Sequence, residues 1–503
     1  MTDASSPTPP ALEGQGHPAG LRTLFFTEMW ERMSYYGMRA LLVLFMVDAI
    51  ENGGLGFTDA TATAVYGLYT ASVYFLTLPG GWIADRLLGA QRTVWFGGVT
   101  IMCGHFILAV PSFYAFFIGL AFVSIGTGLL KPNISAIVGE LYAHDDPRRD
   151  AGFTIFYMGI NVGGALGPLI CSTLGESERF GWHYGFAAAG VGMLFGLIQF
   201  RLSAHRLGEA GLQPSLNRKR PADIPRIRNG WRLVTAGGGI ILVTMILLLA
   251  EVITVDPKNL AENATTFIAV VAGLYFGGLF AFGNLNRDEK KKLVVIMILF
   301  LASAMFWAGF EQAGSSLNLF AERYTDRMVG SFEIPAGWFQ TLNPTFIIIL
   351  APLFSALWVG LARRQLDPST PAKFAIGLLL LGAGFAVMIG AAELVVAGNK
   401  ALPSWLIFTF LLHTMGELAL SPVGLSAITK LSPRRYRGQM MGVWFLGSAL
   451  GLIVAGLLAG ELTSDSIETM PALYTQIVLT TAGSGLLLAI FVRPIRRLMG
   501  DVR

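Results

Sequence analysis

Long apolar runs recur along the chain and are separated by short polar segments. Two examples are WRLVTAGGGIILVTMILLLA at 231–250 and LVVIMILFLASAMFWAGF at 293–310. A helix of about 20 apolar residues is needed to cross the roughly 30 Å of hydrocarbon in a bilayer. The pattern predicts an all-α polytopic membrane protein with fourteen spans, at 22–49, 58–84, 93–110, 112–140, 152–174, 182–203, 231–250, 264–284, 293–321, 336–362, 373–396, 402–428, 438–461 and 471–492.

The composition agrees with this interpretation. Of the 503 residues, 53% are hydrophobic and only 14% are charged, whereas about 25% of a soluble globular domain is charged. Both cysteines, Cys103 and Cys171, fall inside apolar segments. We expect them to be packing residues, because two isolated thiols build neither a disulfide framework nor a metal cluster. No cofactor or metal is expected.

Lysine and arginine are divided unequally between the two sides of the predicted membrane. With a cytoplasmic N-terminus, 27 of them lie in cytoplasmic loops and tails and 5 lie in outer loops. Basic loops stay on the cytoplasmic side, so we expect a multi-pass protein of the cell (inner) membrane with both termini inside. The basic run NRKR at 217–220 is then an orientation signal, and no nucleic-acid partner is expected.

The spans divide into six, two and six. Many transporters are built from repeats around a site at the middle of the membrane, which favours two six-helix bundles with an inserted pair. The first 20 residues lack the basic and apolar regions of a signal peptide. The predicted organisation is a disordered cytoplasmic tail (1–21), an N-terminal bundle (22–203), a cytoplasmic linker (204–230), an inserted helix pair (231–284), a C-terminal bundle (285–492) and a cytoplasmic tail (493–503).

Two short segments indicate similarity between the bundles. LLKP at 129–132 and LALSP at 418–422 each place a polar residue before a proline inside a predicted span. Proline leaves a backbone carbonyl without its helical partner, which is tolerated where that carbonyl faces protein or a wet cavity.

The segment TEMWERMSYYGMR at 27–39 breaks the apolar pattern of the first span. At about 100° per residue, Glu28, Arg32, Tyr35 and Arg39 form one narrow stripe that climbs about 16 Å. Three charges facing lipid would cost about 9 kcal/mol, at roughly 3 kcal/mol each. The stripe must therefore line a water-filled cavity, with partners across it.

Other predicted spans supply such partners. Lys131 adds a cation from the first bundle, and Glu311 and Glu417 add carboxylates from the second. This arrangement suits a short zwitterion, whose carboxylate would bind Arg32 and Lys131. Its ammonium group would lie near Glu417, and an extended dipeptide separates its two ends by roughly 7 Å. The remaining expected wall residues are Asn161, Asn343, Tyr35, Tyr36, Tyr74, Trp307 and Trp444.

At these residues the sequence resembles the proton-dependent oligopeptide transporter (POT, peptide transporter) family of the major facilitator superfamily, in its bacterial form. The family motif ExxERFxYYG appears as EMWERMSYYG at 28–37, with Met33 in place of the usual Phe. Further matching motifs, which cover nearly the whole chain, are GGWIADRLLGAQR, GTGLLKP, FYMGINVGGAL, FWAGFEQ, SFEIPAGWFQTLNPTF and GELALSPVGLS.

The resemblance implies proton-coupled import of di- and tripeptides by alternating access. It also implies specific roles. Glu28, Glu31 and Arg32 would couple protons, whereas Arg39–Glu311 and Lys131–Glu417 would be gating salt bridges. The implied substrate-binding residues are Arg32, Tyr35, Tyr36, Tyr74, Lys131, Asn161, Trp307, Glu311, Asn343, Glu417, Trp444 and Ser448.

A coupling hypothesis follows from electrostatics. A cation beside a carboxylate opposes its protonation, whereas burial favours it. A peptide carboxylate that draws Arg32 away would therefore allow Glu28 or Glu31 to bind a proton.

Structural alternatives stay open for these residues. Glu28 and Arg32 are four residues apart and could form a static pair, and Lys131 could only satisfy carbonyls freed by Pro132. The aromatic residues that could serve only in packing are Tyr74, Trp307 and Trp444.

Other notable side chains are expected to lie outside the site. We expect helix-end contacts for Asp85, Arg86 and Arg92, satisfied positions within the bundle for His105 and His413, and a solvated outer segment for Arg323 and Arg327.

Competing function classes fit less well. The sequence has no HExxH motif and no nucleophile with a convincing base, so no enzyme is predicted. A channel needs neither coupled carboxylates nor two similar halves. Within transport, the alternative is another small solute, such as nitrate, a drug or an amino-acid derivative. The expected partners are peptides, protons and the lipid bilayer, and the protein is expected to be monomeric.

Overall fold

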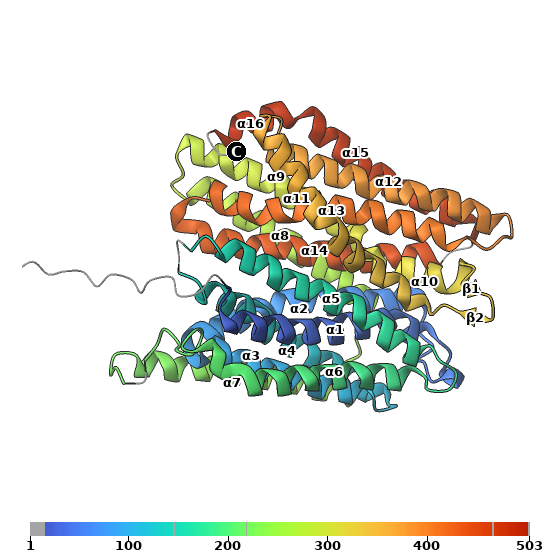
Figure 1. Ribbon diagram of the computed structural model, residues 1–503, viewed down its shortest axis with the longest axis horizontal. Helices are drawn as coiled ribbons and strands as arrows, with labels where there is room; N and C mark the ends of the chain where they lie inside the picture. The colour runs from blue at the N-terminus through green and yellow to red at the C-terminus, as the bar shows by residue number, and fades with distance from the viewer. Residues whose placement is uncertain (1–15, 144–145, 218, 465–466, 501–503) are drawn as a thin grey trace, which may run out of the picture.

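The computed structural model describes residues 16–143, 146–217, 219–464 and 467–500. The outer parts of the two predicted tails, residues 1–15 and 501–503, lie outside the described residues. The long helices run side by side along the longest axis (Figure 1). The helices are α1 (Ala19–Val47), α2 (Asp59–Ile83), α3 (Ala90–Leu108), α4 (Phe113–Glu140), α5 (Arg149–Gly175), α6 (Trp182–Ser203), α7 (Ile224–Leu249), α8 (Pro257–Phe282), α9 (Arg287–Phe310), α10 (Ser316–Tyr324), α11 (Leu342–Arg363), α12 (Thr370–Val396), α13 (Pro403–Leu431), α14 (Arg437–Ser464), α15 (Met470–Ile490) and α16 (Val492–Met499).

The helices agree with the predicted spans. In the described residues, eleven helical stretches are long and apolar enough to cross a membrane. These eleven stretches run from α4 to α15. Together with the three long helices before them, α1 to α3, they match the fourteen predicted spans. The protein is therefore a multi-pass membrane protein. The predicted span 293–321 is interrupted, because a 3₁₀ turn at Glu311–Gly314 separates α9 from α10.

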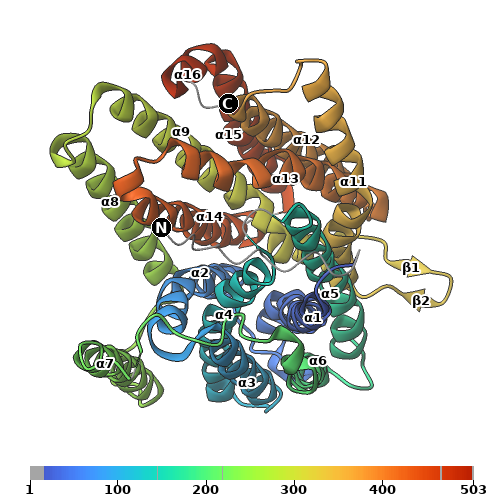
Figure 2. The same ribbon diagram turned by 60° about the vertical axis from the view of Figure 1, so that its left-hand side comes forward.

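The helices form two bundles of six with an inserted pair. α1 to α6 lie together, and α9 to α16 form the other half of the molecule (Figure 1). α7 lies at the edge of the first bundle, where a methyl group on Gly230 would meet Leu87 and Trp82. α8 lies beside α14 (Figure 2). Antiparallel β1 (Met328–Val329) and β2 (Phe332–Glu333) form a hairpin between α10 and α11.

Glycines bring α5 directly against α1. A methyl group on Gly163 would lie 2.1 Å from the Met29 carbonyl oxygen, and one on Gly167 would lie 2.4 Å from that of Met33. Small residues allow such backbone contact between membrane helices. Cys171 is fully buried beside Gly37, so its predicted packing role agrees with its place. The contact holds the polar stripe of α1 in a fixed orientation.

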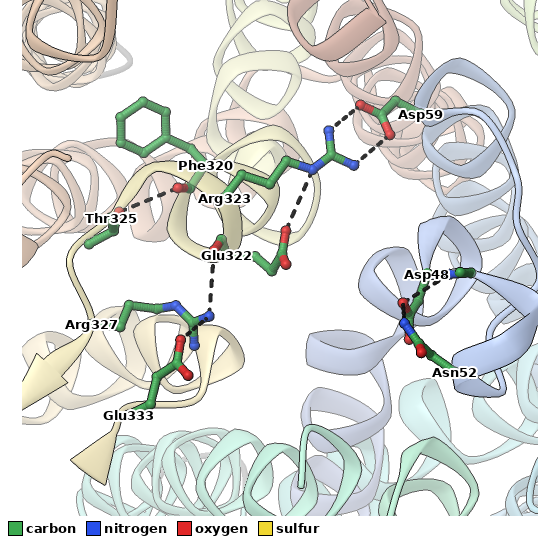
Figure 3. Close-up of polar contacts among 10 residues, drawn as sticks. Asp48, Asn52, Asp59, Phe320, Glu322, Arg323, Thr325, Arg327 and Glu333 are labelled. Atoms are coloured by element: carbon green, nitrogen blue, oxygen red, sulfur yellow. Dashed lines mark hydrogen bonds and ion pairs between the residues drawn. The ribbon is translucent and has the colours of Figure 1, made fainter. Parts of the chain in front are cut away.

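The two halves meet on one side of the molecule. We call the side where α1 begins and α15 ends the terminal side, and the opposite one the far side. On the far side, Asp59 of α2 accepts two bonds from the Arg323 guanidinium of α10, at 2.6 and 2.8 Å (Figure 3). The Asn318 side-chain amide also donates to the Ala40 carbonyl at 2.8 Å. These contacts close the far side between the halves.

Replacing Gly163 or Gly167 with Ala should lower the apparent melting temperature in detergent, because overpacking costs about 1–3 kcal/mol. Gly238→Ala on α7 is the matched control, because nothing lies within 4 Å of the added methyl group. Equal melting temperatures for all three variants would contradict this account of the α1–α5 contact.

Candidate functional site

A cavity of about 220 Å³ lies between the two halves. Its wall comes from α1, α2, α4 and α5 of one half and from α9, α11, α13 and the turns beside them in the other. The lining residues are Glu28, Arg32, Tyr36, Arg39, Tyr74, Lys131, Ser135, Tyr157, Ile160, Asn161, Trp307, Phe310, Glu311, Ala313, Gln340, Asn343, Pro344, Ile347, Phe410 and Glu417. Three cations and Glu28 from one half therefore share one hollow with Glu311 and Glu417 from the other.

The first charged group is a triad on α1. Arg32 Nε lies 2.9 Å from Glu28 Oε1 and 2.5 Å from Glu31 Oε2. All three side chains are buried, with at most 4% of their surface exposed. Arg32 Nη2 and Glu28 Oε2 have no hydrogen-bond partner in the described part of the chain. Glu31 Oε1 likewise has no partner there. The triad therefore holds two carboxylates and one guanidinium, and it keeps one donor and two acceptors free.

Lys131 and Glu417 lie on opposite walls of the cavity. Lys131 Nζ is 4.0 Å from the centre of the Tyr74 ring, a cation–π contact. Glu417 Oε2 accepts a hydrogen bond from Asn343 Nδ2 at 2.9 Å. Among the described residues, no ion pair joins Lys131 to Glu417, so this predicted bridge is not formed in this conformation.

The other predicted bridge is formed. Arg39 Nη2 lies 3.3 Å from Glu311 Oε2, and both side chains are buried. The Tyr66 hydroxyl also donates to Glu311 Oε2, at 3.5 Å. Glu311 lies at the interruption between α9 and α10. The bridge therefore closes the far-side end of the cavity with charges from both halves.

Four of the predicted site residues do not line the cavity in this structure: Glu31, Tyr35, Trp444 and Ser448. Glu31 does not line the cavity itself, but it pairs with Arg32, which does. Tyr35 points toward α2, where its ring lies 6.4 Å from that of Tyr69. Trp444 packs edge-on against Phe374. Tyr35 and Trp444 therefore lie behind the wall, because their rings pack against other residues.

Nine of the lining residues were not predicted: Ser135, Tyr157, Ile160, Phe310, Ala313, Gln340, Pro344, Ile347 and Phe410. Helical spacing could have found the polar ones. Ser135 follows Lys131 by four residues, Tyr157 precedes Asn161 by four, and Gln340 precedes Asn343 by three. Residues at these spacings share a helix face.

Side chains expected outside the site are indeed elsewhere. His105 and His413 are fully buried within their bundles and do not line the cavity. The expectation of a satisfied position was wrong for His105, because neither of its ring nitrogens has a hydrogen-bond partner among the described residues. Arg323 and Arg327 lie in a largely exposed outer segment, as expected, and both also pair with carboxylates. Arg323 pairs with Asp59, and Arg327 Nη2 lies 2.8 Å from Glu333 Oε1 (Figure 3). A partly buried guanidinium needs such carboxylate partners.

Comparison with known proteins agrees with this architecture. Residues 91–474 match the model of the POT family. The chain belongs to the POT family. This POT-family chain is 43% identical to the peptide transporter YePEPT of Yersinia enterocolitica, over 99% of this chain and 98% of the relative. It is 39% identical to a di-/tripeptide transporter of Lactococcus lactis subsp. cremoris, over 97% and 98% of the two chains.

A solved structure gives the same result for the fold. The crystal structure of a variant of peptide transporter POT in complex with alafosfalin superposes with a TM-score of 0.86. It is 39% identical in sequence and covers 97% of each chain. The predicted major facilitator fold with two bundles and an inserted pair is therefore confirmed, and the chain is a transporter rather than an enzyme.

Asp59→Asn should open the far side more often, because it removes the charge that holds Arg323. A cysteine at Ala313, made on a Cys103→Ser background, should then react severalfold faster with a membrane-impermeant thiol reagent applied from the far side. The charge-swapped pair Asp59→Arg with Arg323→Asp should restore slow labelling. An unchanged rate in Asp59→Asn would show that this ion pair does not close the far side.

Proposed function

We propose that this transporter is a proton-coupled symporter that imports di- and tripeptides by alternating access. The observation that carries the proposal is the shared cavity, in which Arg32 and Lys131 face Glu417 and Asn343. The family and the names of its relatives support it. The volume of about 220 Å³ is below the ~300–1,000 Å³ of pockets for drug-sized ligands, which favours a short substrate.

The substrate would lie with its two charges between the halves. Its carboxylate would bind Lys131, which forms no ion pair among the described residues, and Arg32 Nη2, which has no hydrogen-bond partner among them. Its ammonium group would lie near Glu417, Asn161 and Asn343. Asn161 and Asn343 each use their side-chain N–H₂ as donor, so their amide oxygens would be the groups that accept from the ammonium. The Tyr36, Tyr74 and Trp307 rings would contact variable side chains.

Proton coupling would run through the α1 triad. Arg32 carries one positive charge against two buried carboxylates, because its single guanidinium contacts both Glu28 and Glu31. A substrate carboxylate that recruits Arg32 leaves a buried carboxylate without its cation, and protonation then relieves the cost of that buried charge. Glu28, Glu31 and Arg32 are the proposed coupling residues, with the proton as the only coupling ion and no cofactor.

The two gates would alternate. In this structure Arg39–Glu311 is formed and Lys131–Glu417 is not, so we assign it to the state that is closed on the far side. Formation of Lys131–Glu417 would close the terminal side in the other state. Tyr35, Trp444 and Ser448 would reach the substrate only if the wall rearranges between these states.

The membrane arrangement is also a proposal. The excess of Lys and Arg on the terminal side supports cytoplasmic termini in the inner membrane. The boundaries at 22–203, 204–230, 231–284 and 285–492 remain the proposed division of the chain. We propose that the transporter acts as a monomer, because the cavity is built within one chain.

Proteoliposomes with an imposed pH gradient test the function. Uptake of a labelled dipeptide should exceed equilibrium, and an uncoupler should abolish this accumulation. Unlabelled alanyl di- and tripeptides should compete, whereas nitrate and single amino acids should not. Competition by nitrate alone would favour the alternative substrate class.

Glu28→Gln and Glu31→Gln should each reduce proton-driven accumulation by tenfold or more, because neither amide can take up the proton. Exchange of labelled for unlabelled peptide without a gradient should continue. Glu209→Gln, the same change at an exposed carboxylate outside the cavity and the far-side contacts, is the control. Accumulation in both Gln variants at the wild-type level would refute coupling through the triad.

A further inference from the structure

A second cavity, of about 490 Å³, lies on the far side between the halves. We call it the far-side cavity. Its wall includes the end of α1, Glu176 directly after α5, and residues from α10 to the loop after β2. Its charged lining residues are Asp48, Glu176, Glu322, Arg323, Arg327 and Glu333.

Glu176 differs from the other carboxylates of this cavity in its partners. Asp48 accepts from Trp182 Nε1 at 2.7 Å. Glu333 pairs with Arg327 at 2.8 Å, and Glu322 with Arg323 at 3.5 Å. In the part of the chain that the structure describes, Glu176 forms no ion pair and accepts only backbone N–H groups. Asp48 also lacks a cation partner among the described residues, but its donors Ala49, Asn52 and Trp182 belong to its own half. Glu176 differs because both of its donors come from the other half.

The two backbone donors belong to the other half. The Ala336 N–H donates to Oε2 at 2.5 Å, and the Gly337 N–H donates to Oε1 at 2.9 Å. Glu176 follows α5 of the first bundle, and these donors precede α11 of the second. The contact therefore exists only while the far side is closed.

The residues around this contact are closely packed. A methyl group on Gly337 would lie 2.0 Å from Ser172 Oγ and 3.1 Å from Glu176 Oε1. Next to it, Trp338 Nε1 donates to Thr173 Oγ1 at 3.0 Å. Arg327 Nη1 donates to the Ile334 carbonyl at 2.6 Å, which places the strand end beside Glu176. Closure of the far side therefore moves the Glu176 carboxylate from water to the backbone N–H groups of Ala336 and Gly337.

We propose that Glu176 is a further proton-binding residue, which takes up a proton from the far side as the halves close there. The inference rests on the alternating access proposed above and adds a residue that the α1 triad does not include. Because the carboxylate lines the far-side cavity, the proton would exchange with the far-side solution and not cross the membrane. Acid on that side would then favour the closed state.

The direction of this effect follows from proton linkage. Burial raises the pKa of the Glu176 carboxyl from its ordinary 4.5 to about 7, against the opposing effects of the two N–H donors and of Arg327. In the open state the carboxyl returns to water and to its ordinary pKa. The closed state therefore binds the proton more tightly, and its advantage grows as the pH falls from about 7 toward 4.5.

Spin labels across the gate measure this equilibrium directly. Cysteines at Glu51 and Val329, both exposed and on opposite halves, can be labelled on a Cys103→Ser background in liposomes without peptide. The wild-type ratio of closed to open distances should rise on the order of tenfold or more between pH 8 and pH 5. In Glu176→Gln the increase in the closed-to-open ratio that comes from Glu176 should be absent, because the amide does not titrate.

Glu333→Gln is the matched control. It removes a carboxylate from the same cavity, but one that is paired with Arg327 and 57% exposed, so its pH dependence should equal that of wild type. A wild-type pH dependence in Glu176→Gln would overturn the proposal. If Glu176→Gln does not fold, Glu176→Asp should shift the midpoint downward, because the shorter side chain is less enclosed, and an unchanged midpoint would equally overturn it.

The same labels separate this inference from the proposed function. Distances that never change in wild type, with pH or with added dipeptide, would contradict alternating access itself. Distances that change equally in wild type and Glu176→Gln would contradict only the role of Glu176.

Discussion

The buried triad of Glu28, Glu31 and Arg32 is the constraint on which the rest of the structure depends. Charged side chains at the middle of a membrane are costly wherever they face lipid. Here they are at most 4% exposed, and Arg32 contacts both carboxylates. One cation cannot neutralise two carboxylates, so the α1 surface needs a wet cavity and a further positive charge. The cavity between the halves, with Lys131 on its wall, meets both needs.

Helix packing places these charged residues at a site between the two bundles. Gly163 and Gly167 let α5 approach the α1 backbone, which directs Glu28 and Arg32 toward the second bundle. That bundle contributes Glu311 at a helix interruption and Glu417 beside Asn343. Discontinuous helices at the midplane are a recurring way to place binding groups in transporters. The charges are thus paired within α1, by Arg32 with Glu28 and Glu31, and also across the interface, by Arg39 with Glu311.

Much of this arrangement could be predicted from the sequence, because apolar runs mark the spans and buried charges mark the cavity. The Arg39–Glu311 bridge was implied by the family resemblance, and it is formed. Other features depend on tertiary contacts that no local pattern reports. Tyr35 and Trp444 carry suitable rings but turn toward Tyr69 and Phe374. The backbone contact of Glu176 with Ala336 and Gly337 joins segments 160 residues apart and has no sequence signature.

The central claim is that the two ends of a zwitterionic substrate bind charges from different halves. Binding of Ala-Ala, N-acetyl-Ala-Ala and Ala-Ala amide to wild type, Lys131→Gln and Glu417→Gln tests it most directly. Each cap should weaken binding to wild type by about tenfold or more, since a charge-assisted hydrogen bond contributes roughly 1.5–3 kcal/mol. The loss of affinity caused by the C-terminal amide should largely disappear in Lys131→Gln. The loss of affinity caused by the N-acetyl group should largely disappear in Glu417→Gln. Penalties that stay the same in both variants would contradict the account.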